Sequence, residues 1–265
     1  SKGNAYQIAR EHMRKMTRKY YYTSDEIASA SENISLTDVN RFAMNVLKRG
    51  YIQGLVYGNV TEKQARQNTE QLINQLNIKS EKWKKVTHQG RLDFAKGEDI
   101  IQVVYSEVNN SCFSRLQYYG NNSIEEDAQA RVIGTYIESP FFLEMRTSRQ
   151  LGYIVWGGAG SSKKSSYFVF IIQSGDYTAD NLAKQSDEYT ITLPDSLKQL
   201  PDEEYLVIKN GVIEKIKEKP TSIAEQAGRY YTMAFDYDGN FNRNEQLIQA
   251  VEDLKKEEAV QVLSR

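Results

Sequence analysis

The chain has 265 residues, 40% hydrophobic and 26% charged, which is ordinary for a globular protein and long enough to bury a large core. A net charge of −1 gives no overall field for nucleic acid, and no apolar run approaches the roughly 20 residues that cross a bilayer. The single Cys112 excludes an intramolecular disulfide and a cysteine-based zinc cluster. We therefore expect a soluble protein that has no membrane span and does not bind nucleic acid. The sequence does not indicate its compartment.

The charge is distributed unevenly along the chain. Residues 1–84 carry 14 Lys and Arg against 8 Asp and Glu, a net charge of +6, whereas the remaining residues carry 20 and 27, a net charge of −7. Such an asymmetry is typical of two units in different surroundings, although ordinary surface variation produces it as well.

The first part of the chain predicts helices joined by one strand. Apolar residues at helical spacing and a basic, glycine-terminated end at Lys48-Arg49-Gly50 are the main signals. The expected helices span residues 5–20, 24–30, 35–48 and 61–76. Residues 51–57 predict a short strand, and the polar residues 77–90 predict a linker.

The second part alternates strands and helices. Strands are expected at residues 100–105, 112–118, 153–156 and 167–173, with a hairpin turn at the Gly- and Ser-rich residues 157–162. Helices are expected at 124–138, with Pro140 as an interruption, and at 178–190, 201–217, 221–235 and 244–263. Helices interleaved with hairpin-linked strands predict an α+β fold with an antiparallel sheet flanked by helices.

A weak internal repeat relates two helical stretches. Residues 26–42 align without gaps on residues 246–262, a shift of 220 positions, with Ile27 opposite Leu247 and Phe42 opposite Val262. If the repeat is real, the first copy continues into the strand predicted at 51–57, and the second copy ends before its own strand.

The residues for hydrolytic chemistry are largely missing. A helical zinc site needs two His four residues apart with a Glu nearby, and a triad needs a His beside a Ser or Cys. The chain has only His12 and His88, which lie 76 positions apart and are best interpreted as surface residues. We therefore expect no metal site and no hydrolysis by this chain alone.

The most informative stretch follows the helix predicted at 124–138. It contains Arg146-Thr147, Gln150-Leu151-Gly152-Tyr153 and Val155, in the pattern R-T-x-x-Q-L-G-Y-x-V. This pattern resembles the signature of the C-terminal, non-zinc-binding half of the insulinase/pitrilysin-type (M16) zinc metallopeptidases. Three further pieces occur in that family's order: Tyr57 to Thr61, Asn109 to Cys112, and Phe168 to Ser174. The resemblance covers residues 25–175 clearly and the remainder loosely.

The resemblance implies an architecture. The family has four homologous α+β domains, arranged as two halves that close around a peptide. Residues 1–84 would be the C-terminal part of a preceding M16-like domain with a linker, and residues 85–265 an M16-like (LuxS/MPP-like) C-terminal domain without its last strand. The cofactor, zinc, would belong to the N-terminal half of the parent through H-x-x-E-H, so the implied partners are that half and peptide substrates.

The resemblance also implies roles for two residues. Tyr153 would be a catalytic residue whose hydroxyl stabilises the oxyanion of the peptide carbonyl under attack, and Arg146 would bind the substrate backbone with Tyr153. Spacing alone leaves open that Arg146 caps a helix and that Tyr153 is an ordinary strand aromatic. Arg149 stands where the family usually has a Glu, at a position expected on the solvent face.

Three functions remain open at this point. The chain is either the C-terminal part of a single-chain peptidase, a separately encoded non-catalytic subunit, or a purely structural peptide-binding module. In the first two, strands 154–156 and 167–172 would form a wall of the peptide-degrading chamber, where an open sheet edge can pair with a substrate strand.

Overall fold

The computed structural model describes residues 4–77, 79–80, 97–121, 123–162 and 165–264, and these form two compact units. Unit 1 combines residues 1–21, 91–218 and 240–265. Unit 2 combines residues 22–90 and 219–239. None of the described helices is long and apolar enough to cross a membrane.

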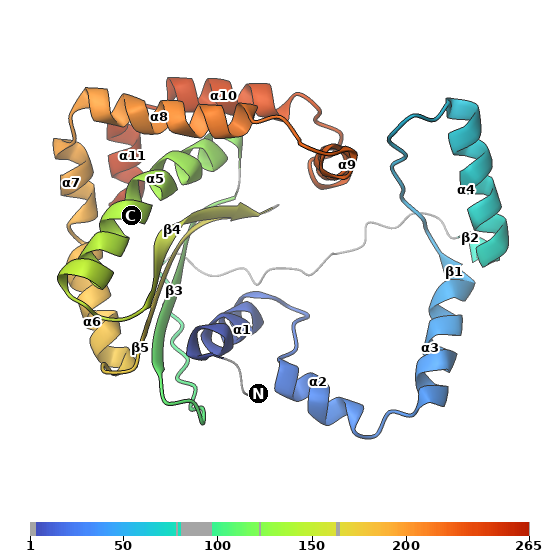
Figure 1. Ribbon diagram of the computed structural model, residues 1–265, viewed down its shortest axis with the longest axis horizontal. Coiled ribbons are helices and arrows are strands. Elements are labelled where there is room, and N and C mark those ends of the chain that lie inside the picture. The colour runs from blue at the N-terminus through green and yellow to red at the C-terminus, as the bar shows by residue number, and fades with distance from the viewer. Residues whose placement is uncertain (1–3, 78, 81–96, 122, 163–164, 265) are drawn as a thin grey trace. The chain divides into compact units, whose positions relative to one another are not determined.

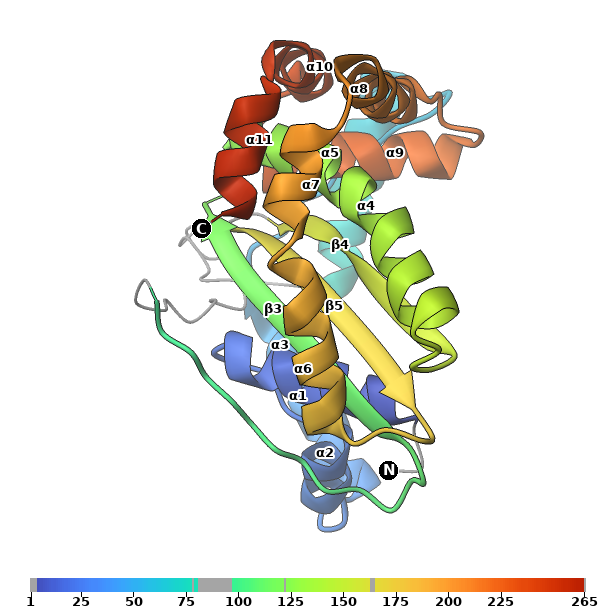
Figure 2. The same ribbon diagram turned by 90° about the vertical axis from the view of Figure 1, so that its left-hand side faces the viewer.

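Unit 1 is built on a three-stranded antiparallel sheet (Figures 1 and 2). Strands β3 (Ser111–Gly120), β5 (Ser165–Ser174) and β4 (Ile154–Ser162) lie side by side in that order, so β5 is central. The register pairs Arg115 with Phe170 and Val155 with Ile172. The α+β class with an antiparallel sheet flanked by helices is therefore confirmed.

Helices cover both faces of this sheet. The long helix α5 (Ile124–Phe142) packs along β4 on one face, and α1 (Ala5–Thr17) packs on β3 and β5. The backbone N–H of Tyr6 on α1 donates to Gln173 Oε1 on β5 at 2.8 Å. The remaining helices of unit 1 are α6 (Ala179–Thr190), α7 (Leu193–Gln199), α8 (Asp202–Lys217), α10 (Arg243–Asp253) and α11 (Lys256–Leu263).

Helix α5 is the centre of the core, because nine of its 19 residues are buried and all of these except Asp127 are apolar. Ser123 caps its start by accepting the Glu126 N–H at 3.2 Å, and the Glu126 carboxylate accepts the Ser123 N–H at 2.9 Å. Small residues allow the helix to lie close to β4. A Cβ on Gly157 would stand 2.6 Å from the Phe141 ring, and one on Gly134 would stand 2.9 Å from the Ala159 backbone nitrogen.

Unit 2 contains less buried surface. Its elements are α2 (Ser24–Ser31), α3 (Leu36–Lys48), α4 (Glu62–Leu76), α9 (Ile223–Tyr231) and the π-helix η2 (Thr232–Asp236), with a two-residue parallel pair formed by β1 (Arg49–Gly50) and β2 (Lys79–Ser80). Tyr57 meets Tyr230 edge to face, with ring centroids 5.2 Å apart.

The two helical stretches of the internal repeat have the same construction. The single helix expected at 244–263 is wrong, because the chain leaves helical conformation at the buried Leu254 and α11 restarts at Lys256. In the first copy, α2 ends at Ser31 and α3 starts at Leu36, 220 positions earlier. Where each second helix begins, a carboxylate accepts the backbone N–H of the residue three positions before it. Asp38 accepts from Ser35 at 3.0 Å, and Glu258 accepts from Lys255 at 3.1 Å.

Two predicted strands are not strands in the structure. Residues 51–57 and 100–105 pair with no other strand in the part of the chain that the structure describes. Their apolar side chains are exposed, with Ile101 at 88% and Tyr105 at 93%. An alternating apolar pattern fits a pleated surface, but a strand forms only when a second backbone accepts and donates its hydrogen bonds.

The turn and the helix interruption predicted from glycine and proline were also wrong. Residues 157–162, predicted as a hairpin turn, belong to β4, where glycine permits the close approach of α5. The turn itself and residues 81–90 of the predicted linker lie outside the described residues. Pro140 does not interrupt the helix, because the fully buried Phe141 holds the last turn of α5 in the core and outweighs the local cost of proline.

A buried carboxylate ties α5 to its neighbours and predicts a large stability effect. Asp127 is 1% exposed and accepts from Arg243 at 3.0 Å, Arg131 at 3.1 Å and Ser161 at 2.8 Å. In the Asp127→Ala variant, the buried Arg243 loses its ion pair with Asp127, so we expect the free energy of unfolding to fall by about 3–5 kcal/mol in urea denaturation. The exposed Glu214→Gln control should change it by less than about 0.5 kcal/mol, and equal losses in both variants would contradict the buried pair.

Candidate active-site contribution

The predicted site lies where α5 leaves the core and enters β4. Directly after Phe142 the helix widens into the π-helix η1 (Leu143–Ser148), whose N–H groups bond five residues back instead of four. The Arg149 N–H donates to the Glu144 carbonyl at 2.9 Å. Met145 is fully buried and anchors the turn in the core.

Three consecutive residues then turn the chain into the strand. Gln150 adopts a left-handed conformation with φ 52°, Leu151 is 2% exposed, and Gly152 lies against β5. A Cβ on Gly152 would stand 1.9 Å from the carbonyl oxygen of Gln173, so no other residue fits there without a backbone shift. The next residue, Tyr153, is 79% exposed.

The structure brings the two sequence-predicted site residues together. The guanidinium carbon of Arg146 lies 4.5 Å from the centroid of the Tyr153 ring and 5.1 Å from that of Phe142. Both rings therefore make cation–π contacts with one cation. Among the described residues Arg146 has no carboxylate partner, so its N–H groups are available to a ligand.

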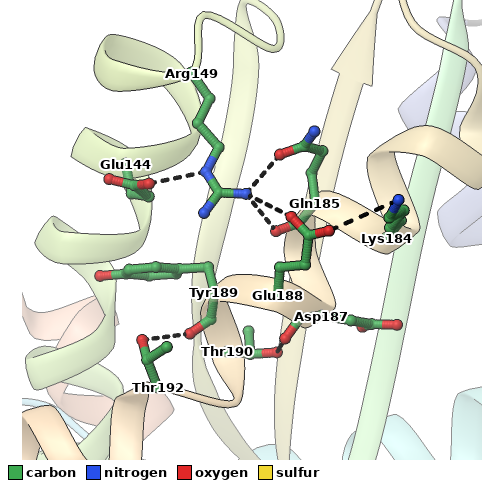
Figure 3. Close-up of polar contacts among 9 residues, drawn as sticks. All are labelled: Glu144, Arg149, Lys184, Gln185, Asp187, Glu188, Tyr189, Thr190 and Thr192. Atoms are coloured by element: carbon green, nitrogen blue, oxygen red, sulfur yellow. Dashed lines mark hydrogen bonds and ion pairs between the residues drawn. The ribbon is translucent and has the colours of Figure 1, made fainter.

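Arg149, the residue after η1, points to α6 (Figure 3). Its Nε donates to Glu144 at 2.8 Å, and its Nη1 donates to the Gln185 side chain at 2.5 Å and lies 3.4 Å from Glu188 Oε2. The side chain is only 25% exposed. The expectation that position 149 faces solvent is therefore wrong, because α6 packs beside η1 and supplies polar partners that sequence spacing does not reveal.

Other candidates for chemistry are not assembled into a site. Burial raises the pKa of the Cys112 thiol to about 12, so it stays protonated and weakly nucleophilic near neutral pH. His12 is half-buried on α1 and not a surface residue, and its Nδ1 has no hydrogen-bond partner among the described residues. His88 lies outside them. Within the described ranges no group of three His, Cys, Asp or Glu could hold a metal ion.

The arrangement can recognise a polar, extended ligand. An exposed phenol hydroxyl and a guanidinium supported by two rings offer directed donors to carbonyl oxygens. Phe142 is not among the residues predicted from the sequence, although its position four residues before Arg146 on one helical face was a usable signal. Gln185 and Glu188 were not predicted either, because no local signal exists for them.

The chain is similar to several known peptidases and their domains. A family model described as PQQ synthase PqqF-like, C-terminal lobe domain 4, matches residues 132–231 of the chain. Human insulin-degrading enzyme is 24% identical over 261 residues, and a nardilysin-like protein of Arabidopsis thaliana is 24% identical over 249 residues. The chain is similar to the C-terminal half of the M16 peptidases.

The fold agrees with this similarity. It superposes on the crystal structure of pitrilysin with a TM-score of 0.79 and 20% identity, over 99% of this chain and 28% of that one. It also matches a peptidase M16 inactive domain from Pseudomonas fluorescens with a TM-score of 0.59 and 14% identity, over 98% of this chain and 62% of that one. The chain matches 91% and 96% of its own length to the nardilysin-like protein and the insulin-degrading enzyme, but spans only about a quarter of theirs.

The close approach of Gly152 to β5 predicts a steric effect of a single methyl group. In Gly152→Ala the new Cβ meets the Gln173 carbonyl, so we expect a loss of about 1–3 kcal/mol of unfolding free energy. The matched control is Gly211→Ala in the middle of α8, where a Cβ meets nothing within 4 Å. It should stabilise the chain by about 0.5–1 kcal/mol, because alanine favours helix. Urea denaturation of both variants measures this, and equal shifts would contradict the close contact.

Proposed function

We propose that this chain is the non-catalytic C-terminal portion of a zinc-dependent endopeptidase of the insulinase family. It would form a wall of the chamber in which peptides are degraded, and supply Arg146 and Tyr153 to the bound peptide. The observation that carries the proposal is the stacking of the Arg146 guanidinium on the 79%-exposed ring of Tyr153. The guanidinium of Arg146 and the hydroxyl of Tyr153 thus place two hydrogen-bond donors beside the start of β4.

Each of the two residues would have a distinct role. The hydroxyl of Tyr153 would donate a hydrogen bond to the peptide carbonyl oxygen as negative charge develops on it. Arg146 would donate to a backbone carbonyl of the substrate and set its register, with Phe142 and Tyr153 limiting the orientations of the guanidinium. Both contributions act on the substrate, so they need no metal ligand from this chain.

Zinc fits a different part of the protein. The described residues supply no ligand set, so we propose that the N-terminal half of the parent holds zinc and activates the attacking water. One relative, from Schizosaccharomyces pombe, carries the name putative zinc protease mug138. Closure of the two halves around a peptide would then complete the site.

The edge of the sheet beside Tyr153 supports a role in holding peptides. β4 is hydrogen-bonded to β5 on one side, and no described strand pairs with its other side. An extended peptide can add to such an edge through backbone hydrogen bonds, which depend little on its sequence. The exposed Trp156 on the same strand would contact its side chains.

For the domain organisation, we propose that residues 1–84 end one M16-like domain and that residues 85–265 form most of the next. The matched helix restarts at Leu36 and Lys256 support this duplication. Burial at the equivalent positions differs: Phe42 is 70% exposed, whereas Val262 is 2% exposed. In a longer protein, helices of the preceding domain would cover Phe42, as α5 and α7 pack on α11 here.

Two alternatives follow from specific observations. A separately encoded subunit would use the same Arg146 and Tyr153, and a reading frame without H-x-x-E-H upstream would favour it. A purely structural peptide-binding module is favoured by the similarity to an inactive M16 domain. In such a module, the loss of the Tyr153 hydroxyl would have no kinetic consequence.

The oxyanion role predicts a defined kinetic change. In Tyr153→Phe the ring stays under Arg146 and only the hydroxyl is lost, so kcat for a fluorogenic peptide should fall by roughly 10²–10³-fold while KM changes little. The assay uses this chain joined to, or mixed with, its zinc-bearing half, with equal zinc content and folding in both proteins. Tyr177→Phe, a half-exposed tyrosine after β5, is the control and should leave kcat unchanged. Unchanged kcat in Tyr153→Phe would contradict the proposal and favour the structural module.

The domain proposal predicts that one substitution has two different costs. In this chain alone Phe42→Ala should change the unfolding free energy by less than about 0.5 kcal/mol, because the side chain is exposed. In a protein extended upstream to include the preceding domain, the same substitution should cost about 3–5 kcal/mol. Chemical denaturation of both proteins measures the difference, and an equally small cost in the longer protein would contradict the proposed division.

A further inference from the structure

The turn between α5 and β4 carries two arginines with opposite surroundings. Arg146 contacts the exposed rings of Phe142 and Tyr153, whereas Arg149 points to α6 and is held by polar groups. The two residues belong to one short segment, η1 with the residue that follows it. Any change in the winding of this segment therefore moves both side chains relative to the sheet.

The contact between Glu144 and Arg149 depends on the π-helical winding. In an α-helix each residue turns by about 100°, so side chains five positions apart point in different directions, and pairs form at spacings of three or four. The ion pair here spans five positions at 2.8 Å, parallel to the five-residue backbone bond between the same two residues at 2.9 Å. The side-chain pair thus favours the π form of the turn over the α form.

Helix α6 fixes the same guanidinium from outside. Arg149 Nη1 reaches the backbone carbonyl of Gln185 at 3.3 Å, the side-chain oxygen of Gln185 at 2.5 Å and Glu188 at 3.4 Å (Figure 3). Lys184 lies 3.9 Å from Glu188, so two positive and two negative side chains balance in the cluster. The planar guanidinium serves a carboxylate on η1 and an amide on α6 at once, which a lysine ammonium cannot do with the same geometry.

We propose that Arg149 is a positioning residue that holds η1 in its π-helical form and thereby keeps Tyr153 under the guanidinium of Arg146. If the turn rewound as an α-helix, the residues from Arg146 onward would rotate and the left-handed Gln150 would lose its place before Gly152. Tyr153 is 79% exposed, so little packing other than the contact with Arg146 holds its ring, and its orientation depends on this turn. The catalytic consequence rests on the proposed function, but the structural half is measurable on this chain alone.

The structural test labels Tyr153 with 3-fluorotyrosine and records its ¹⁹F resonance in the full chain. Arg146→Gln removes the cation and defines the resonance of an unstacked ring. In Arg149→Gln we expect the resonance to move most of the way toward that position, and Glu144→Gln should move it in the same direction. Arg149→Lys should give an intermediate shift, because the positive charge near Glu144 remains while the guanidinium hydrogen bonds to Gln185 are lost.

The matched control is Arg115→Gln. Arg115 on β3 also reaches α6, through an ion pair with Asp187, but it lies away from the turn. Its loss should lower thermal stability about as much as the loss of Arg149 while leaving the Tyr153 resonance in place. A resonance unmoved in Arg149→Gln, or moved equally in Arg115→Gln, would overturn the proposal.

Kinetics separate the failure of this inference from that of the proposed function. With the zinc-bearing half present, Arg149→Gln should lower kcat by roughly 10- to 100-fold with KM little changed, because a small misplacement of a catalytic group is costly. If Tyr153→Phe lowers kcat and Arg149→Gln does not, positioning by Arg149 is excluded and the proposed function stands. If Tyr153→Phe has no effect while the ¹⁹F resonance moves, the proposed function fails and Arg149 still holds the turn.

Discussion

The complete burial of Phe141 and Met145 fixes how α5 meets the sheet, and the exposed residues nearby depend on it. With these two side chains in the core, the helix cannot end at Pro140, and it must make room for a turn toward β4 within a few residues. The widened π-helix provides that room. Gly152 then lets the strand start against the carbonyl of Gln173. The half-buried Arg146 and the exposed Tyr153 owe their positions to this buried geometry.

Polar contacts complete what apolar packing begins. Asp127 joins α5 to α10 and β4 in a buried cluster, and Arg149 joins the other end of the same helix to α6. Such groups stabilise a fold only when every partner is present, so they specify one arrangement of the helices over others. The chain thus keeps the cation–π pair of Arg146 and Tyr153 at the end of a helix that is fixed at both ends.

The part of the chain outside this core follows a different physical pattern. Residues 51–57 and 100–105 have the composition of strands but no pairing partner among the described residues, and the apolar face of α3 is exposed at Val39 and Phe42. In the second helix pair, the equivalent Ala259 and Val262 are buried. The same local construction therefore gives a core in one place and an exposed surface in the other, depending on whether other helices, such as α5 and α7 beside α11, pack against it.

The sequence by itself determined the features that local interactions control. Helix starts at caps such as Ser123, the strands 112–118 and 167–173, and the signature around Arg146 and Tyr153 could all be predicted, since they depend on neighbours in sequence. Only the tertiary structure decided the π-helical turn, the role of Gly157 inside a strand and the partners of Arg149. These depend on contacts with residues that are distant along the chain, and side-chain periodicity contains no information about which distant element lies alongside.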